Sequence, residues 1–138
     1  MEVAAQISAE DKAFEFSPGL FGFPESKRYI VTDIPGGGDI IKQMISLDES
    51  NLSFTLAYPY AFFSDYAPDI PDADLQDLGA ERPDQILVMV LVSVPEQFKD
   101  ATVNLKAPIA FNPFTRKARQ IILAEDRYST RQRLFSAQ

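Results

Sequence analysis

The stretch ILVMVLVSV, at residues 86–94, is the longest apolar run of the 138-residue sequence. Successive side chains of a strand point to opposite faces, so an unbroken apolar run places apolar groups on both faces. Strands buried on both sides have this pattern. Crossing a bilayer as a helix would need roughly 20 such residues. The run therefore predicts a central strand covered on both sides, and no membrane span.

Three further strands are predicted on the N-terminal side of this run. The segments RYIVTDI at 28–34 and IIKQMISL at 40–47 flank PGGGD at 35–39. Glycine readily adopts the positive φ angles that tight hairpin turns require, so the two segments are expected to form a hairpin. In LSFTLAY at 52–58, large apolar residues alternate with small or polar ones. This period of two is typical of a strand with one buried face.

One short helix and three short strands complete the expected elements. The helix covers ADLQDL at 73–78, where Asp72 can cap the N-terminus and Gly79 can end the helix. The strand candidates are separated by Asn112-Pro113 and by a basic stretch at 116–119, both interpreted as turns. They lie at residues 102–105, 108–112 and 120–123. Residues 125–138 fit neither a helical nor a strand period, and we leave a final helical turn or a strand open.

These elements predict a mainly β protein: a strongly curved antiparallel sheet or small β-barrel with one short helix. A chain of 138 residues fits one domain. We take that domain to span residues 1–138, with an ordered core from about residue 14 to about residue 135. No repeat, low-complexity segment or linker divides the sequence.

The absence of histidine and cysteine excludes most catalytic arrangements. A Ser–His–Asp triad and a thiol nucleophile are impossible, and the usual zinc ligands are missing. Nothing in the spacing of the 20 acidic residues marks a catalytic pair. The N-terminus also lacks the basic and then apolar layout of a secretion signal. We therefore expect no enzyme activity, no metal, no cofactor and a cytoplasmic location.

Two apparent ligand motifs fail on specific requirements. The glycines at 36–38 are not followed by the Gly-Lys-Ser/Thr of a phosphate loop, so we interpret them as a turn. Asp72, Asp74 and Asp77 resemble the start of a calcium loop. Counted from Asp72, however, position 6 is Asp77 where glycine is needed, and position 12 is Pro83 where glutamate is needed. Helix capping and solvation explain these aspartates.

The net charge of −7 is unevenly distributed along the chain. The C-terminal segment is basic, through Lys106, Arg116, Lys117, Arg119, Arg127, Arg131 and Arg133. Nucleic-acid binding draws on phosphate neutralisation, which an acidic protein opposes at long range. We expect no direct nucleic-acid binding, and an acidic surface suits a basic protein partner better. The alternative is that these charges only solvate the surface.

The segment YPYAFFSDY at 58–66 concentrates five aromatic residues just before an acidic, proline-containing loop. In an extended chain, Phe62 and Phe63 would point to opposite sides, leaving one ring for a neighbouring loop or a partner. Exposed aromatic side chains are common anchors of protein interfaces. The alternative is that all five rings pack beneath the loop at 65–84.

Four blocks, in order, resemble the FliW family of flagellar assembly factors. They are GLFGFPE at 19–25; LSFTL at 52–56 with Tyr58-Pro59 through Asp65-Tyr66; VPE at 94–96 with TVNLKAPI at 102–109; and QIIL at 120–123 with Tyr128. The resemblance runs from about Phe14 to Phe135. TVNLKAPI, followed by Asn112-Pro113 and Arg116-Lys117, is its most specific part. The chain departs from the family at KQMIS, residues 42–46, where members usually carry an aromatic-Leu-Gln-Ser stretch.

This resemblance implies a regulator that acts by switching protein partners. It would hold the RNA-binding translational regulator CsrA off its target messages until cytoplasmic flagellin binds and releases CsrA. A flagellin chaperone without CsrA control and a direct RNA-binding protein are the alternatives. We expect a monomer whose partner surface is the 60–66 segment with the adjoining acidic loop, and Asn104 and Lys106 are secondary candidates. The candidate residues are Tyr60, Phe62, Phe63, Asp65, Tyr66, Asp69, Asp72, Asn104 and Lys106. Asn104 has the alternative role of satisfying backbone groups at a strand end.

Overall fold

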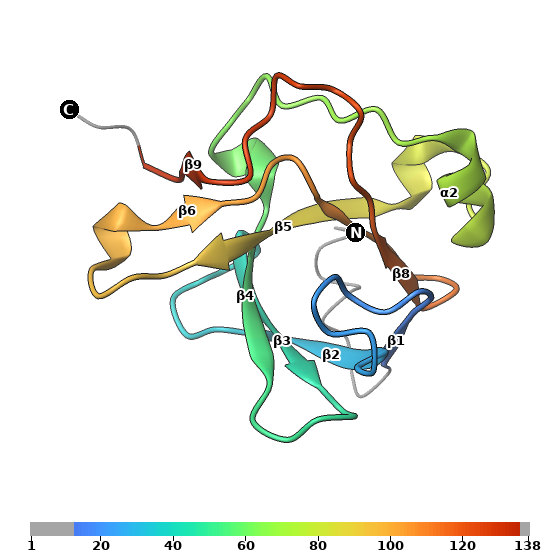
Figure 1. The fold of residues 1–138 in the computed structure, drawn as a ribbon, viewed down its shortest axis with the longest axis horizontal. Coiled ribbons are helices and arrows are strands. Elements are labelled where there is room, and N and C mark those ends of the chain that lie inside the picture. The colour runs from blue at the N-terminus through green and yellow to red at the C-terminus, as the bar shows by residue number, and fades with distance from the viewer. Residues whose placement is uncertain (1–12, 136–138) are drawn as a thin grey trace.

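The computed structural model describes residues 13–135. Its described elements, in chain order, are nine strands, one α-helix and three 3-10 turns (Figure 1). Their bounds are β1 Phe14–Phe16, β2 Arg28–Asp33, β3 Ile41–Ser46, β4 Ser53–Ala57, η1 Pro59–Ala61, α2 Asp72–Asp77, η2 Pro83–Gln85, β5 Leu87–Ser93, η3 Phe98–Asp100, β6 Thr102–Val103, β7 Ile109–Asn112, β8 Lys117–Gln120 and β9 Gln132–Arg133. No helix within residues 13–135 has the length and apolar character needed to span a membrane.

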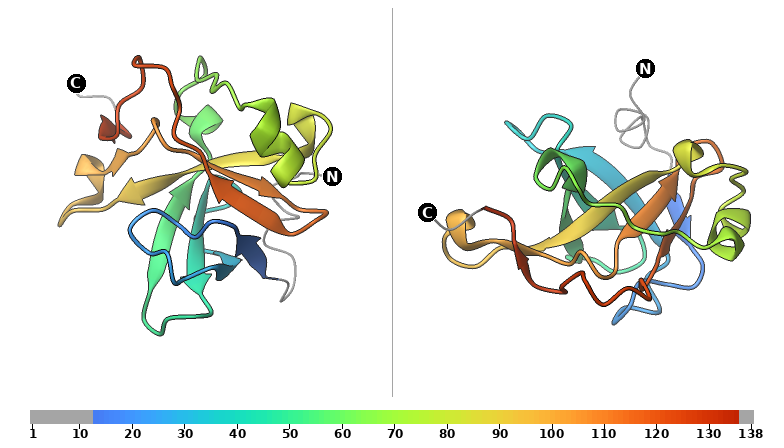
Figure 2. Two further views of the ribbon diagram at one scale, coloured as in Figure 1. Left: turned by 45° about the vertical axis from the view of Figure 1, so that its right-hand side comes forward. Right: turned by 90° about the horizontal axis from the view of Figure 1, so that it is seen from above.

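The sheet closes on itself as a small barrel, which confirms the predicted fold class. Its strand order is β4-β3-β2-β1-β8-β7-β5-β6-β9, and an added β4–β5 pairing closes the ring. β6 and β9 continue beyond β5 as a projection beside the barrel (Figure 2). One pairing departs from the antiparallel pattern, because β1 runs parallel to β8. Closure leaves few open strand edges, which limits edge-to-edge association.

The central position predicted for the apolar run is confirmed by β5. It pairs with β4 along one edge, and with β7 and then β6 along the other. Its two faces belong to two different clusters of buried side chains. Leu87 and Met89 face the barrel interior, whereas Val88 and Val90 face an outer core. The run is apolar on both faces because each face has its own core.

Aromatic rings fill the barrel interior. Phe14 and Phe16 lie against Phe111 with ring centroids 4.9 and 6.1 Å apart, and Phe16 meets Tyr29 at 5.1 Å, all edge to face. Such pairs contribute about 0.5–1.5 kcal/mol beyond the burial of their area. The outer core lies between the barrel wall, the segment around α2 and the C-terminal segment. The outer core therefore fixes the segments that carry the candidate residues.

The predicted hairpin of β2 and β3 is confirmed, but two strands were misplaced or missed. β8 covers Lys117–Gln120, which we expected to be a turn, and the expected strand at 120–123 is wrong. Ala118 points inward between outward-facing Lys117 and Arg119, so only one small apolar residue marks this strand. β1 was not predicted, because three residues carry too short a pattern. In the undecided tail, Gln132–Arg133 forms β9, and residues 136–138 lie outside the described part of the chain.

Helix α2 ends as predicted, but its N-terminus is not capped as predicted. Pro71 occupies the N-cap position and no side chain caps the helix, so the predicted capping role of Asp72 is wrong. Gly79 ends the helix as predicted, with φ of +75°. The Ala80 amide donates to the Leu75 carbonyl at 2.8 Å, which satisfies one of the last carbonyls.

Replacing Gly79 by alanine should lower the free energy of unfolding by about 2 kcal/mol. A positive φ costs a residue with a Cβ about 1–2 kcal/mol. The new Cβ would also lie 2.9 Å from Thr115 Cγ2. Gly38→Ala is the matched control, since Gly38 has φ of +56° and open space around it, and should cost about 1 kcal/mol. Urea titration measures both; equal losses would show that the contact with Thr115 relaxes freely.

Candidate partner-binding surface

Tyr66 is a buried support of the candidate surface, with a side chain only 4% exposed. Its hydroxyl donates to the Leu105 carbonyl at 2.8 Å, which ties the aromatic segment to the chain after β6. Burial raises the pKa of the Tyr66 hydroxyl well above its usual range. Tyr66, predicted as part of the partner surface, is therefore a buried residue of the outer core. Its ring lies under the surface instead of projecting from it.

A row of four tyrosines crosses this side of the molecule. Ring centroids are 5.3 Å apart between Tyr58 and Tyr60, 5.8 Å between Tyr60 and Tyr66, and 4.8 Å between Tyr66 and Tyr128. Burial raises the pKa of the Tyr60 hydroxyl, as it does for Tyr66. The guanidinium of Arg127 covers the outer end of the row, 4.6 Å from the Tyr128 centroid. The row joins the end of β4 to the C-terminal segment.

Phe62 and Phe63 do not diverge as expected for an extended chain. The 3-10 turn η1 precedes them and Phe62 has helical backbone angles, so both rings pack against the outer core and are half-buried. Phe62 contacts Phe135 at 6.0 Å, and Phe135 contacts Phe98 at 5.3 Å. Phe98 is 45% exposed and marks the outer edge of this cluster. The alternative, in which all five rings pack beneath the loop at 65–84, does not describe Phe62, because its ring packs against Phe135 near the C-terminus.

The acidic candidates carry charge that the fold leaves unbalanced. Asp65, Asp69 and Asp72 are exposed, and none forms an ion pair with another residue of the part described, 13–135. In contrast, Arg119 holds Asp74 at 2.7 Å and Asp77 at 2.9 Å. Asp65 lies within the aromatic segment, and Asp69 and Asp72 follow it in the chain. They give this side a local negative charge.

Asn104 and Lys106 organise a turn next to the buried hydroxyl of Tyr66. Asn104 Oδ1 accepts hydrogen bonds from the amides of Lys106 at 3.1 Å and Ala107 at 3.0 Å, as its alternative role predicted. Lys106 Nζ donates to the Glu125 carbonyl at 2.6 Å and pairs with Asp126 at 3.4 Å. These contacts hold the C-terminal segment against the barrel. Both side chains therefore stabilise the fold, and any contact with a partner would be a second role.

Sequence reasoning missed that the C-terminal segment forms part of this surface. Tyr128 accepts a hydrogen bond from the Ala67 amide at 3.0 Å, and Arg127 donates to the Ala67 carbonyl at 3.3 Å. Glu125 accepts from the Asp69 amide at 3.4 Å. Figure 1 shows this red segment running beside the green segment that leads to α2. The aromatic residue at 128 was noticed, but no periodic pattern placed it in space.

The sequence also did not predict a small hollow of about 150 Å³. It opens beside the tyrosine row, between the chain before α2 and the start of β5. Its walls are Tyr58, Tyr60, Pro68, Ile70, Pro83, Ile86, Leu87 and Val88. We call it the Tyr60 pocket. It brings Tyr60 together with the loop that carries Asp69.

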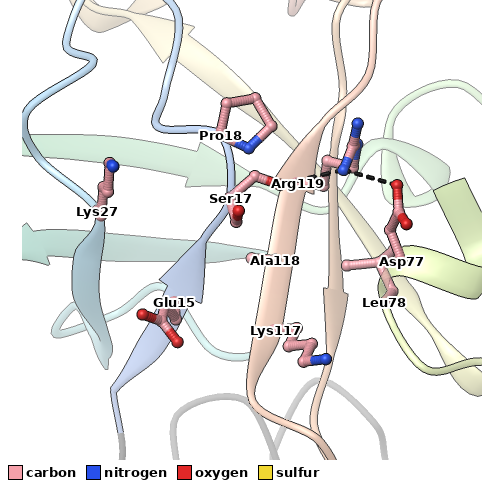
Figure 3. Close-up of a pocket in the computed structure, with 9 residues that line it drawn as sticks. All are labelled: Glu15, Ser17, Pro18, Lys27, Asp77, Leu78, Lys117, Ala118 and Arg119. Carbon is pink, nitrogen blue, oxygen red and sulfur yellow. Dashed lines mark hydrogen bonds and ion pairs between the residues drawn. The ribbon is translucent and has the colours of Figure 1, made fainter.

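A larger hollow, of about 750 Å³, lies by β1, β8 and the end of α2 (Figure 3). Charges of both signs line it, with Glu15 and Asp77 against Lys27, Lys117 and Arg119. Arg119 is engaged there, because it pairs with Asp77 and donates to the Ser17 carbonyl at 3.0 Å. None of the sequence-predicted site residues lines this hollow.

Folding engages part of the basic C-terminal segment in ion pairs. Four basic residues of the C-terminal segment pair with acids: Arg119 with Asp74 and Asp77, Lys106 with Asp126, Arg127 with Glu125, and Arg133 with Asp100. Ion pairs therefore engage at least four of the seven basic residues of this segment. Local negative charge beside the tyrosine row remains the clearer electrostatic feature.

The sequence matches the family model described as FliW protein over residues 2–134. A flagellar assembly factor FliW from Symbiobacterium thermophilum is 54% identical, covering 91% of this chain and 91% of its own. One from Natranaerobius thermophilus is 36% identical, covering 94% of this chain and 85% of its own. A crystal structure of the flagellar assembly factor FliW is similar with a TM-score of 0.84 and 30% identity, over 91% of this chain and 86% of that chain.

Proposed function

The chain belongs to the FliW family of flagellar assembly factors, and on that premise we propose that it is a non-enzymatic, partner-switching regulator. It binds the translational regulator CsrA and antagonises the binding of CsrA to RNA. It also binds flagellin, which releases CsrA. We propose further that it acts in the cytoplasm as a monomer with a single domain.

The switch requires two protein sites on one small scaffold with negative coupling between them. If flagellin lowers the affinity for CsrA by some factor, CsrA must lower the affinity for flagellin by the same factor. The tyrosine row and the outer core join the segment around residue 66 to the C-terminal segment through direct contacts. Occupation of either segment could therefore bias the other.

The observation that carries this proposal is the family match over residues 2–134. The surface beside the tyrosine row adds a physical reason, since the unpaired Asp65, Asp69 and Asp72 complement a basic protein. An RNA-binding protein is basic where it contacts phosphates. Direct RNA binding by this chain is disfavoured, because most of its C-terminal cations are paired with carboxylates.

Calorimetric titration tests the proposal with CsrA and flagellin from the same organism, singly and then in sequence. We expect each protein to bind, and we expect saturation with flagellin to lower the affinity for CsrA at least fivefold, within the usual range of coupling. A target message is added as a control and should not bind this chain. An unrelated basic protein of similar size controls for nonspecific attraction.

Each other result selects a different function. Binding to flagellin without CsrA would leave a flagellin chaperone. Binding of the message with a steep salt dependence would indicate a direct RNA-binding protein. Binding to none of the three would overturn the proposal.

A further inference from the structure

The Tyr60 pocket has the size and lining of an anchor site for one side chain. Apart from two tyrosines, its walls are proline and aliphatic residues. Its volume of about 150 Å³ matches that of apolar cavities that hold a benzene-sized group. Pockets of this kind accept the central anchor residue of a protein partner. A larger ligand would find too little enclosed volume.

Two tyrosine hydroxyl groups at the pocket have no hydrogen-bond partner among residues 13–135. Neither Tyr58 nor Tyr60 donates or accepts a side-chain hydrogen bond with another residue of the part of the chain described, 13–135. Tyrosine hydroxyls usually find a partner when they are buried. At the wall of an open pocket, they offer hydrogen bonds to the backbone of a segment that enters it.

An exposed carboxylate, Asp69, lies in the chain between two residues of the pocket wall. Asp69 lies between the wall residues Pro68 and Ile70, is exposed, and has no ion pair within residues 13–135. Asp84 follows the wall residue Pro83 and is paired with exposed Arg82 at 3.1 Å. The net charge of these residues is therefore negative, because Asp69 has no ion pair within residues 13–135. Lysine or arginine in a bound segment would be attracted to it.

We propose that the Tyr60 pocket holds one apolar side chain of CsrA, flanked by Lys or Arg residues that face Asp69. This proposal rests on the proposed function. It assigns the binding of CsrA to the Tyr60 pocket. Charge complementarity selects this partner, because a protein that neutralises RNA phosphates must carry exposed cations. The half-buried Ile70 supplies one wall of the pocket, and Asp69 next to it supplies the charge.

The pocket is tested by filling it. Ile70→Trp should weaken binding to CsrA at least tenfold in calorimetric titration, because the larger ring occupies the space for the partner's side chain. Val94→Trp is the matched control, since Val94 is 49% exposed and does not line the pocket. It should bind as the wild type does. If Ile70→Trp does not fold, Ile70→Ala is used instead. It widens the pocket and should weaken binding three- to tenfold.

The charge is tested by reversing it. Asp69→Lys should weaken binding to CsrA about tenfold and flatten the dependence of affinity on salt, because the attraction is screened by ions. Glu96→Lys is the matched control, since Glu96 is exposed, has no ion pair within residues 13–135, and does not line the pocket. It should leave the affinity unchanged. Urea titration of each variant confirms that it is folded.

The outcomes separate this inference from the proposed function. Weakened CsrA binding in the pocket and charge variants, with both controls unchanged, supports the inference. If the wild type binds CsrA and the variants bind equally well, the inference fails and the proposed function stands. Loss of flagellin binding alone would overturn the assignment of the pocket to CsrA. If the wild type does not bind CsrA, both the switch and the inference fail.

Discussion

Tyr66→Ala is expected to lower the free energy of unfolding by about 3–5 kcal/mol, the usual cost of removing a buried aromatic side chain. The ring is 4% exposed and contacts Tyr60 and Tyr128. Its removal would leave a cavity in the outer core and would free the Leu105 carbonyl of its hydrogen bond. Urea-induced unfolding followed by circular dichroism measures the loss.

Tyr66→Phe separates the hydrogen bond from the packing of the ring. It keeps the ring and removes only the hydroxyl that donates to Leu105, so we expect a loss of about 1 kcal/mol. If Tyr66→Ala had the stability of the wild type while binding of CsrA or flagellin fell, the residue would be a surface contact and the burial argued above would be wrong.

Asn112→Ala is expected to cost about 3 kcal/mol of stability, because Asn112 is 2% exposed and satisfies three groups at once. Its Nδ2 donates to the Leu78 carbonyl at 2.8 Å, and its Oδ1 accepts from the amides of Phe114 at 2.9 Å and Thr115 at 3.3 Å. These bonds fasten the turn between β7 and β8 to the end of α2. Urea titration measures the effect.

Asn104→Ala is the matched control for this prediction. Asn104 also accepts from two turn amides, but it is only half-buried and, within residues 13–135, donates to no carbonyl of a second element. A loss of about 1 kcal/mol is expected. Equal losses in the two variants would show that the link from Asn112 to α2 adds nothing to stability.

The predictable part of the fold was the part with a repeating apolar pattern. β5 and the hairpin of β2 and β3 could be predicted, because their residues alternate or are continuously apolar over several positions. β8 could not, since only Ala118 points inward and its neighbours are cationic. Those cations are outward-facing side chains, and Arg119 is paired with the helix that follows the acidic loop. Strand identity there depends on tertiary pairing that local sequence does not contain.

For the candidate surface, the sequence predicted which residue types are present but not which of them are buried. The concentration of aromatics at 58–66 indicated a special segment, but which rings are buried depends on η1 and on residues far along the chain. Tyr128 and Glu125 accept hydrogen bonds from the amides of Ala67 and Asp69, just after this segment and more than 50 positions earlier in the chain. The binding roles of the nine candidate residues stay predictions.

The parallel pairing of β1 with β8 has a consequence for how the barrel forms. Glu15 and Phe16 pair with Lys117 and Ala118, roughly 100 positions later in the chain. Contacts between such distant residues require closure of a long loop before they contribute stability, which slows folding. During synthesis the first strand has no partner on this edge until β8 has left the ribosome. Ring closure is therefore a late step, and a chain truncated before residue 117 would leave both edges exposed to aggregation.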